Sequence, residues 1–291
     1  MKIPVFFRPE MIASSGSSIS PSAHKPKILI EALKFEGFPI EIREQQPVTR
    51  DDYYAVHRKE FVDGVLDLKI DNGFENKSAD VAASLPYTSG AMLDAARFAT
   101  KEMPACAPVS GFHHAEWSRA MGFCTFNGLM VAAYKLVKEG KKVAIIDCDM
   151  HYGNGTDNIM ANVAELSKVY HLTFGKFYTR RHQAAHYLRE LREASNLRAD
   201  LKSYAPDVIL YQAGADCHID DPYGGVLTTQ EMYERDVLMF EIARGLGIPI
   251  CWNLAGGYQV EKDGSCRKVI DLHINTFKAA MKVYGVPMVC R

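Results

Sequence analysis

Three side chains able to bind a metal ion occur at every second position in the segment from Lys142 to Thr156. The segment reads KVAIIDCDMHYGNGT, and Asp147, Asp149 and His151 follow directly on an apolar run. If a strand continued through these positions, its period of two would place all three side chains on one side. Neighbouring carboxylates repel each other, and a bound cation would remove that cost. The pattern therefore predicts a metal site.

Reactive side chains also follow three other apolar runs. His113 and His114 come after PVSGF, Asp216 comes after VILYQAGA, and Tyr258 comes after ICWNLAGG. Apolar runs without alternation are typical of buried parallel strands. The carboxyl ends of parallel strands meet at one edge of a sheet, where open α/β sheets bind ligands. We therefore expect these separated groups to meet at one site.

Asp149, His151 and Asp216 together would offer two oxygens and one nitrogen to a metal ion. Catalytic zinc sites use three protein ligands and leave one position open, whereas structural sites use four and often include cysteine. Bound zinc would lower the pKa of its water from about 16 towards about 7 and would polarise a carbonyl group. Attack of water on an amide is the chemistry that this set predicts.

Such a reaction needs a group that carries protons, and the adjacent His113 and His114 are the candidates. One of them can face the attacking water while its neighbour holds position or modulates charge. A histidine base needs an orienting partner on its other nitrogen, for which Asp147 and Asn154 are candidates. The oxyanion needs a donor besides the metal, and Tyr258, after two glycines, can bring a phenol there.

Strand-like and helix-like patterns alternate along nearly the whole chain. Strands are predicted at Ile3–Phe7, Ile40–Arg43, Ala105–Ser110, Lys142–Asp149, Lys168–Thr173, Asp207–Ala213 and Ile248–Leu254. Helices are predicted at Lys25–Phe35, Arg50–Lys69, Ser89–Thr100, Asn127–Glu139, Ala184–Ser203, Thr229–Leu246 and Arg267–Tyr284. This alternation predicts a three-layer α/β/α fold with a mostly parallel central sheet. Nothing resembles a linker, so residues 1–291 are expected to form a single domain.

The composition argues against several classes of protein. The 291 residues carry a formal net charge of −1, with acidic and basic residues mixed along the chain. This balance gives no charged face for nucleic acid or an anionic membrane. No apolar run approaches the roughly 20 residues of a membrane-spanning helix. The seven cysteines include no CxxC pair, and no signal peptide is recognisable, so we expect a cytoplasmic protein.

Four segments resemble blocks of the histone deacetylase family, which has the arginase-like α/β fold. They are SGFHHAEWSRAMGFCTFNG, IIDCDMHYGNGT, YQAGADCHIDDP and NLAGGYQ, in the order of that family, and a weaker likeness includes SPSAHKP. The resemblance implies a zinc-dependent deacetylase that removes an acyl group, acetyl in the first place, from an amine. The implied substrates are acylated lysine side chains and small acetylpolyamines. Bacterial class II-like deacetylases and acetylpolyamine amidohydrolases are the kinds of relative that it suggests.

The same resemblance implies two cation sites. Asp149, His151 and Asp216 would bind one zinc ion per chain. Members of the family often hold a structural potassium ion behind the zinc. It would use backbone oxygens of Asp147, Asp149 and His151 with groups near His171 and Leu172.

For catalysis, the resemblance implies that His114 is the general base and later the general acid, oriented by Asn154. His113 would be its electrostatic partner, held by Asp147. Tyr258 would donate a hydrogen bond to the scissile carbonyl oxygen. Asn154 stands where first-class enzymes of the family have aspartate, and is similar to class II and bacterial members.

A narrow channel for the acylated amine is also implied. Phe123 resembles one aromatic wall of this channel, and either Phe177 or Tyr178 would form the opposite wall. The expected substrate-binding positions are Phe123, Gly122, Phe177, Gly256 and Gly257.

Two other functions stay open. An arginase-like ureohydrolase with two manganese ions would need further carboxylates, and DCDMHYGNG lacks the DAHxD arrangement of that family. A catalytically silent module that binds acyl-lysine or a partner protein would not need the base candidate and the tyrosine. Among the remaining histidines, His218 is expected either to line the mouth of the site or to lie on the surface. The others expected to be structural or solvated are His57, His182, His186 and His273.

Overall fold

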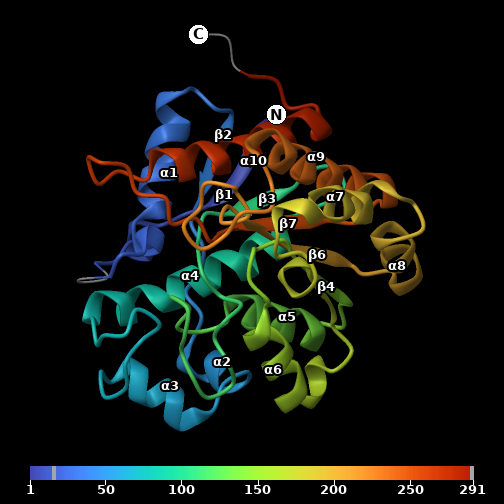
Figure 1. The fold of residues 1–291 in the computed structure, drawn as a ribbon. Helices are drawn as coiled ribbons and strands as arrows, with labels where there is room; N and C mark the ends of the chain where they lie inside the picture. The colour runs from blue at the N-terminus through green and yellow to red at the C-terminus, as the bar shows by residue number, and fades with distance from the viewer. Residues whose placement is uncertain (15–17, 289–291) are drawn as a thin grey trace.

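The computed structural model describes residues 1–14 and 18–288 (Figure 1). Within them, seven strands form one sheet in the order β2-β1-β3-β7-β6-β4-β5. Every neighbouring pair of strands is parallel. The strands are β1 (Ile3–Phe6), β2 (Ile40–Arg43), β3 (Ala105–Ala107), β4 (Val143–Asp147), β5 (Tyr170–Thr173), β6 (Val208–Gly214) and β7 (Ile250–Ala255). All seven lie within or overlap the predicted strands, and the predicted parallel α/β sheet is confirmed.

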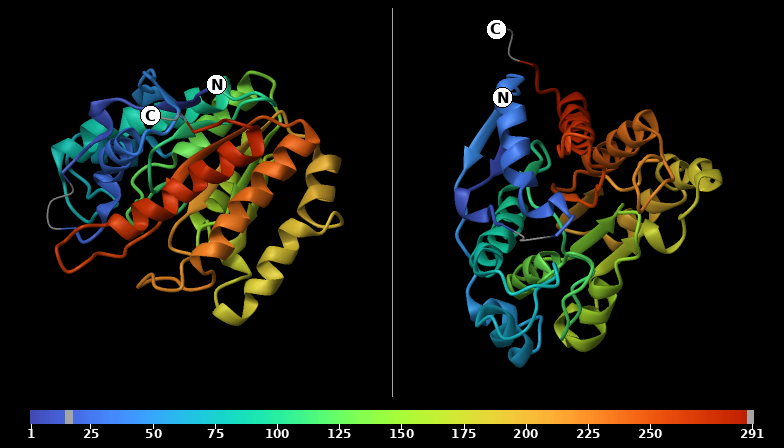
Figure 2. Two further views of the ribbon diagram at one scale, coloured as in Figure 1. Left: turned by 90° about the horizontal axis from the view of Figure 1, so that it is seen from above. Right: turned by 60° about the vertical axis from the view of Figure 1, so that its left-hand side comes forward.

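Helices cover both faces of this sheet, which confirms the three-layer arrangement (Figures 1 and 2). One layer contains α1 (Lys25–Phe35), α7 (Ala184–Arg192), α8 (Leu197–Tyr204), α9 (Thr229–Leu246) and α10 (Arg267–Tyr284). The other contains α2 (Arg50–Tyr54), α3 (Lys59–Leu66), α4 (Ala79–Phe98), α5 (Gly128–Lys138) and α6 (Asn154–Asn162). Short 3-10 helices lie at Pro9–Met11, Pro21–Ala23, Ala164–Leu166, Phe174–Lys176 and Arg181–Gln183.

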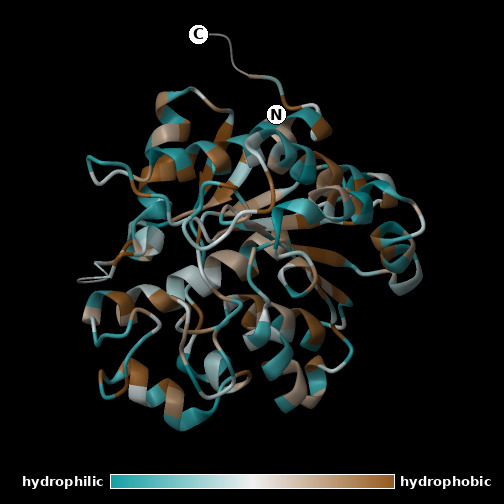
Figure 3. Cartoon of the chain, in the orientation of Figure 1, coloured by the Kyte–Doolittle hydropathy of each residue, from teal (hydrophilic) through white to brown (hydrophobic). Residues whose placement is uncertain are grey.

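Two buried clusters of apolar side chains hold the layers together. In β4, Val143 and Ile145 join the cluster under α4 and α5, whereas Ala144 and Ile146 join the cluster under α9 and α10. Figure 3 shows hydrophobic residues along strands such as β6 and hydrophilic residues on outer turns of the helices. A strand buried on both faces reads as an uninterrupted apolar run, which is why the sequence identified it.

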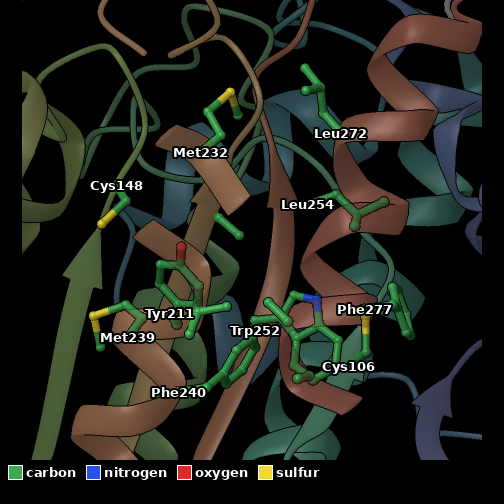
Figure 4. Packing of buried hydrophobic residues seen from close by; sticks show 14 of the residues in the cluster. Cys106, Cys148, Tyr211, Met232, Met239, Phe240, Trp252, Leu254, Leu272 and Phe277 are labelled. Carbon is green, nitrogen blue, oxygen red and sulfur yellow. The ribbon is translucent and has the colours of Figure 1, made fainter. Parts of the chain in front are cut away.

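Several aromatic rings lie in the apolar cluster under α9 and α10. The ring of Phe240 lies 6.0 Å from that of Tyr211 and 5.3 Å from that of Trp252, both in edge-on contacts (Figure 4). Such edge-on pairs are favourable beyond the area that they bury. They fix α9 against the middle of the sheet.

The helix boundaries differ from the prediction at several places. The predicted helices Arg50–Lys69 and Ala184–Ser203 are each divided in two. Helix α4 begins ten residues before the predicted start, with the side chain of Ser78 accepting the N–H of Val81, and it contains Pro86. Helix α6 was not predicted, because its first turn contains Asn154 and Gly155, which have poor helix propensity.

No helix among the described residues combines the length and apolar character needed to cross a membrane. The six described cysteines are buried and free, whereas Cys290 lies outside the described residues.

Candidate active site

The loop between β4 and α6 carries two of the predicted metal ligands. The strand ends at Asp147, so the expectation of a strand continuing to Asp149 is wrong. Turn-like hydrogen bonds position the ligands instead. The Oδ1 atom of Asp147 accepts the N–H of Asp149 at 3.1 Å, and Oδ1 of Asp149 accepts the N–H of His151 at 3.0 Å. These side-chain bonds to the backbone make a compact turn at the strand end.

The structure brings Asp149, His151 and Asp216 together although they follow different strands. The Nδ1 atom of His151 lies 2.9 Å from Oδ2 of Asp216 and 3.3 Å from Oδ1 of Asp149. One ligand atom from each residue lies within 4.8 Å of the others. Both carboxylates are buried, and the donor set of one nitrogen and two oxygens fits a catalytic zinc ion.

Buried charges perturb these three groups strongly. Burial and the charge of Asp149 raise the pKa of Asp216 to about 7. Burial alone would raise the pKa of Asp149, but His113 and His151 outweigh it and lower that pKa. Hydrogen bonds to the two carboxylates raise the pKa of His151 to about 11. Two buried carboxylates this close are expensive without a counter-charge, which a divalent cation would supply.

The two adjacent histidines have different partners. Nδ1 of His113 lies 2.7 Å from Oδ2 of Asp147, and its Nε2 lies 3.5 Å from Oδ1 of Asp149. Nδ1 of His114 lies 2.6 Å from Oδ1 of Asn154. Each histidine therefore has one of the two orienting partners considered from the sequence. The two rings are 4.1 Å apart between centroids.

These partners give the histidines opposite protonation behaviour. Burial lowers the pKa of His113, but the charges of Asp147 and Asp149 outweigh it and raise that pKa to about 9. Burial, and next the neighbouring His113, lower the pKa of His114 to about 4. A carboxylate partner favours the charged imidazole, whereas a neutral amide does so much less. At pH 7, His114 is the neutral member of the pair.

Aromatic side chains surround the mouth of this cluster. The ring of Phe123 lies 5.3 Å from that of Tyr258, and the ring of Tyr223 meets Tyr258 edge-on at 5.2 Å. Phe177 is 54% exposed, and among the described residues its ring contact is with Tyr178, at 6.4 Å. Tyr223, which has no predicted role, is thus a second aromatic neighbour of Tyr258.

Burial and the nearby carboxylates of Asp216 and Asp149 raise the pKa of Tyr258 well above its usual value. Its phenol therefore keeps its proton and can donate a hydrogen bond. The backbone N–H of Tyr258 donates to Oδ2 of Asp221 at 2.7 Å. This buried carboxylate also accepts the N–H of Tyr223 at 3.0 Å, and so it links the two aromatic loops.

Two glycines permit close approaches inside the site. A Cβ atom on Gly256, which has φ of +48°, would lie 2.2 Å from the carboxylate carbon of Asp216. A Cβ atom on Gly122, at φ of +58°, would lie 2.5 Å from the ring of His114. Both backbones therefore press against functional side chains in a way that a larger residue would prevent.

Lys25 is a further part of the site that sequence reasoning missed. It is fully buried in the first turn of α1, and its Nζ donates to the carbonyl oxygen of Gly256. Burial lowers the pKa of Lys25 to about 8 in spite of the nearby Asp216. The SPSAHKP block contains Lys25, but its Lys-Pro pair predicts only the start of a helix.

Two other histidines have structural roles in the fold. Nδ1 of His57 lies 2.9 Å from the carbonyl oxygen of Glu116, and its Nε2 accepts the N–H of Asn127 at 3.0 Å. His218 is buried, with Nε2 at 2.9 Å from Oγ1 of Thr229.

The family model of the histone deacetylase domain matches residues 21–178 and 178–274. The chain belongs to the histone deacetylase family. Two solved structures share the fold of this deacetylase-family chain, each at 18% identity. One is the HDA15 HD domain, with a TM-score of 0.72; the match covers 98% of this chain and 95% of that domain. The other is an acetylpolyamine aminohydrolase from Burkholderia pseudomallei, with a TM-score of 0.68; the match covers 97% of this chain and 99% of that protein.

Curated relatives of this deacetylase-family chain come from bacteria and plants. An uncharacterized protein from Picosynechococcus sp. is 26% identical over 281 residues, which cover 89% of this chain and 93% of that protein. Acetoin utilization protein AcuC from Staphylococcus aureus is 33% identical over 159 residues, covering 46% and 41%. Histone deacetylase 18 from Arabidopsis thaliana is 31% identical over 185 residues, covering 52% of this chain but 26% of that protein. The match thus spans about a quarter of the plant enzyme's length.

Proposed function

We propose that this protein is a zinc-dependent amidohydrolase that removes an acyl group, acetyl in the first place, from an amine. The observation that carries the proposal is the convergence of Asp149, His151 and Asp216 beside a neutral histidine and a protonated tyrosine. Membership of the histone deacetylase family supports hydrolase activity. Zinc itself and the identity of the amine are parts of the proposal.

When bound by the three ligands, zinc would polarise the scissile carbonyl group and lower the pKa of a water molecule. His114 is neutral at pH 7 and can take the proton of the attacking water, because Asn154 holds its Nδ1 and leaves Nε2 free to act. The same histidine can later return a proton to the leaving amine. His113, paired with Asp147, keeps a positive charge beside this base.

Tyr258 would stabilise the charge that develops on the carbonyl oxygen. Its raised pKa keeps the phenol protonated, and a preformed donor of this kind acts mainly on the transition state. Gly256 and Gly257 allow the turn that brings Tyr258 to the site, and both have positive φ.

An acylated lysine side chain or a small acylated polyamine fits the proposed entrance. Phe123 and Tyr258 provide aromatic surface for an extended aliphatic chain. Outside them, a surface hollow of about 690 Å³ is lined by Tyr258, Asp220 and Lys268 among others. Asp220 and Lys268 give this hollow both signs of charge, so the proposal includes both substrate classes.

We also propose the structural potassium ion behind the zinc site. The supporting observation is Nε2 of His171, which is buried without a hydrogen-bond partner among the described residues and lies next to Gly153. A nearby cation would satisfy that nitrogen. Replacing potassium chloride with tetramethylammonium chloride at equal ionic strength should then change turnover, and equal turnover would remove this ion from the proposal.

Two broader expectations also stay as proposals. We infer that residues 1–291 form one catalytic domain, because one sheet carries all parts of the site. We also place the protein in the cytoplasm, in keeping with the free and buried state of the described cysteines.

A turnover screen tests the proposed function directly. The protein would be stripped of metal, reloaded with one equivalent of zinc, and offered acetyl-lysine peptides, longer acyl-lysine peptides and acetylated polyamines. We expect turnover of at least one class with zinc, loss of turnover without metal, and inhibition by hydroxamates, which chelate zinc. Full activity in a preparation shown to be metal-free would refute the proposal.

A further inference from the structure

Helix α9 carries an arginine in the interior, directly below the candidate metal site. Arg235 is only 1% exposed, and its Nε donates to Oδ1 of the adjacent Asp236 at 2.8 Å. A buried ion pair loses much hydration and is seldom retained for stability alone, since apolar side chains of similar volume often serve as well. The contacts of the guanidinium therefore call for another explanation.

One nitrogen of this guanidinium joins the ends of two strands. Nη1 donates to the carbonyl oxygen of Gly214 at 2.7 Å and to that of Cys148 at 3.2 Å. Cys148 immediately precedes Asp149, and Gly214 lies two residues before Asp216. The carbonyl groups that Arg235 holds thus belong to the two segments that carry the carboxylate ligands.

These contacts occur where the sheet stops aligning the two segments. Strands β4 and β6 pair as far as Asp147 and Gln212, and the N–H of Cys148 makes a last bond to the carbonyl oxygen of Gln212 at 3.0 Å. Beyond that point the segments are in direct contact, because a Cβ atom on Gly214 would lie 2.4 Å from Cα of Asp149. Arg235 supplies the next link between them.

Asp236, the carboxylate partner of Arg235, is itself fixed by other side chains. Asp236 accepts hydrogen bonds from the hydroxyl of Tyr211 and, at 2.6 Å, from Oγ1 of Thr276. The carbonyl oxygen of Cys148 also accepts from Sγ of Cys217 at 3.1 Å. A side chain fixed at both ends transmits a defined geometry, which a flexible side chain would not do.

We propose that Arg235 is a positioning residue for the metal site, which sets the spacing of the carboxylates of Asp149 and Asp216. This inference rests on the proposed zinc site and goes beyond it, because it assigns part of the metal affinity to a residue on α9. Outer groups that orient metal ligands commonly contribute about 10- to 100-fold to metal affinity.

The test measures zinc affinity and stability separately. Zinc dissociation constants would be measured by competition with a chromophoric chelator, and unfolding of the metal-free proteins would be followed in urea. We expect Arg235→Met to bind zinc about 10- to 100-fold more weakly. Arg235→Lys keeps a donor and should recover part of the affinity.

The matched control is Phe240→Leu on the same helix. It reduces core packing without touching either carbonyl group, so it should lower stability and leave zinc affinity unchanged. The proposal is overturned if a folded Arg235→Met or Arg235→Lys protein binds zinc as tightly as the parent. The proposal is also overturned if Phe240→Leu weakens zinc binding as much as the substitutions of Arg235 do. Failure of the parent protein to bind zinc would instead refute the proposed function.

Discussion

At the scale of single residues, two chemically identical imidazoles differ because their partners differ. Asp147 keeps His113 charged, whereas burial and the neighbouring His113 leave His114 neutral at pH 7, because the amide of Asn154 raises its pKa too little to offset them. The sequence named both pairs of candidates, since each partner stands in a recognisable block. It could not show the size of the pKa difference, which depends on burial and distance.

Replacing Tyr258 with phenylalanine should reduce turnover while leaving the metal ligands intact. The phenol is the proposed donor to the carbonyl oxygen, and loss of one such donor typically costs about 100- to 1,000-fold in kcat. The measurements are kcat and zinc content of the purified variant. Tyr223→Phe is the control, because its ring stays beside Tyr258 and it has no proposed donor role. Equal kcat in Tyr258→Phe and the parent would remove Tyr258 from the mechanism.

Replacing Asn154 with aspartate should move the acid limb of the pH profile. A carboxylate beside Nδ1 favours the charged imidazole, so the pKa of His114 rises and less neutral base remains at a given low pH. The acid limb of kcat/KM should therefore shift to higher pH, with zinc content unchanged. If the acid limb of kcat/KM lay at the same pH in the zinc-loaded variant and in the parent protein, His114 would not be the titrating base.

At the scale of elements, the sequence predicted strands better than loops. Every strand was found, because runs such as Val143–Ile146 are buried on both faces and show no alternation. Helix α9 was also bounded correctly, since Thr228 caps it and Gly247 ends it. The turn that carries Asp149 was missed because local bonds from carboxylate side chains to the backbone replace the strand there. Helix α6 was missed because contacts from elsewhere in the chain stabilise it. One such contact is the bond between the N–H of Gly155 and the carbonyl oxygen of His113.

The turn after β7 should tolerate no side chain at Gly256. In Gly256→Ala the new methyl group would collide with the carboxylate of Asp216, and we expect zinc affinity to fall at least tenfold. Gly264→Ala in the same connection is the matched control. Its φ is +82°, but a Cβ atom there meets nothing within 4 Å, so it reports backbone strain alone. Equal zinc affinities in the two variants would contradict the collision.

The connection between α2 and α3 should make stability sensitive to acid. Burial lowers the pKa of His57 to about 4, compared with about 6.5 in the unfolded chain. Stability from the neutral imidazole is thus present above pH 6.5 and is lost as the pH falls towards 4. The full effect is roughly 3 kcal/mol.

Urea unfolding at pH 7 and pH 5 measures this effect. The loss of stability on acidification should be smaller in His57→Gln than in the parent protein, because other titrating groups contribute equally to both. An identical loss of stability in the two proteins would show that the pKa of His57 is not lowered in the folded state.

At the scale of the whole molecule, the fold collects groups from four strand ends at one edge of a parallel sheet. The sequence predicted this edge, because His114, Asp149, Asp216 and Tyr258 each follow an apolar run. It did not predict Lys25 or the role of Arg235. Both are buried charges that contact backbone carbonyl groups, and such contacts leave no periodic or spacing signal in the chain.

The most direct test of the account is anomalous diffraction at the zinc edge from crystals of the zinc-loaded protein. We predict one peak per chain, about 2.0–2.2 Å from Nδ1 of His151 and from one carboxylate oxygen each of Asp149 and Asp216. A peak elsewhere, with these three side chains unliganded, would contradict the central claim. Two metal peaks in this pocket would instead favour the two-metal chemistry of an arginase-like ureohydrolase.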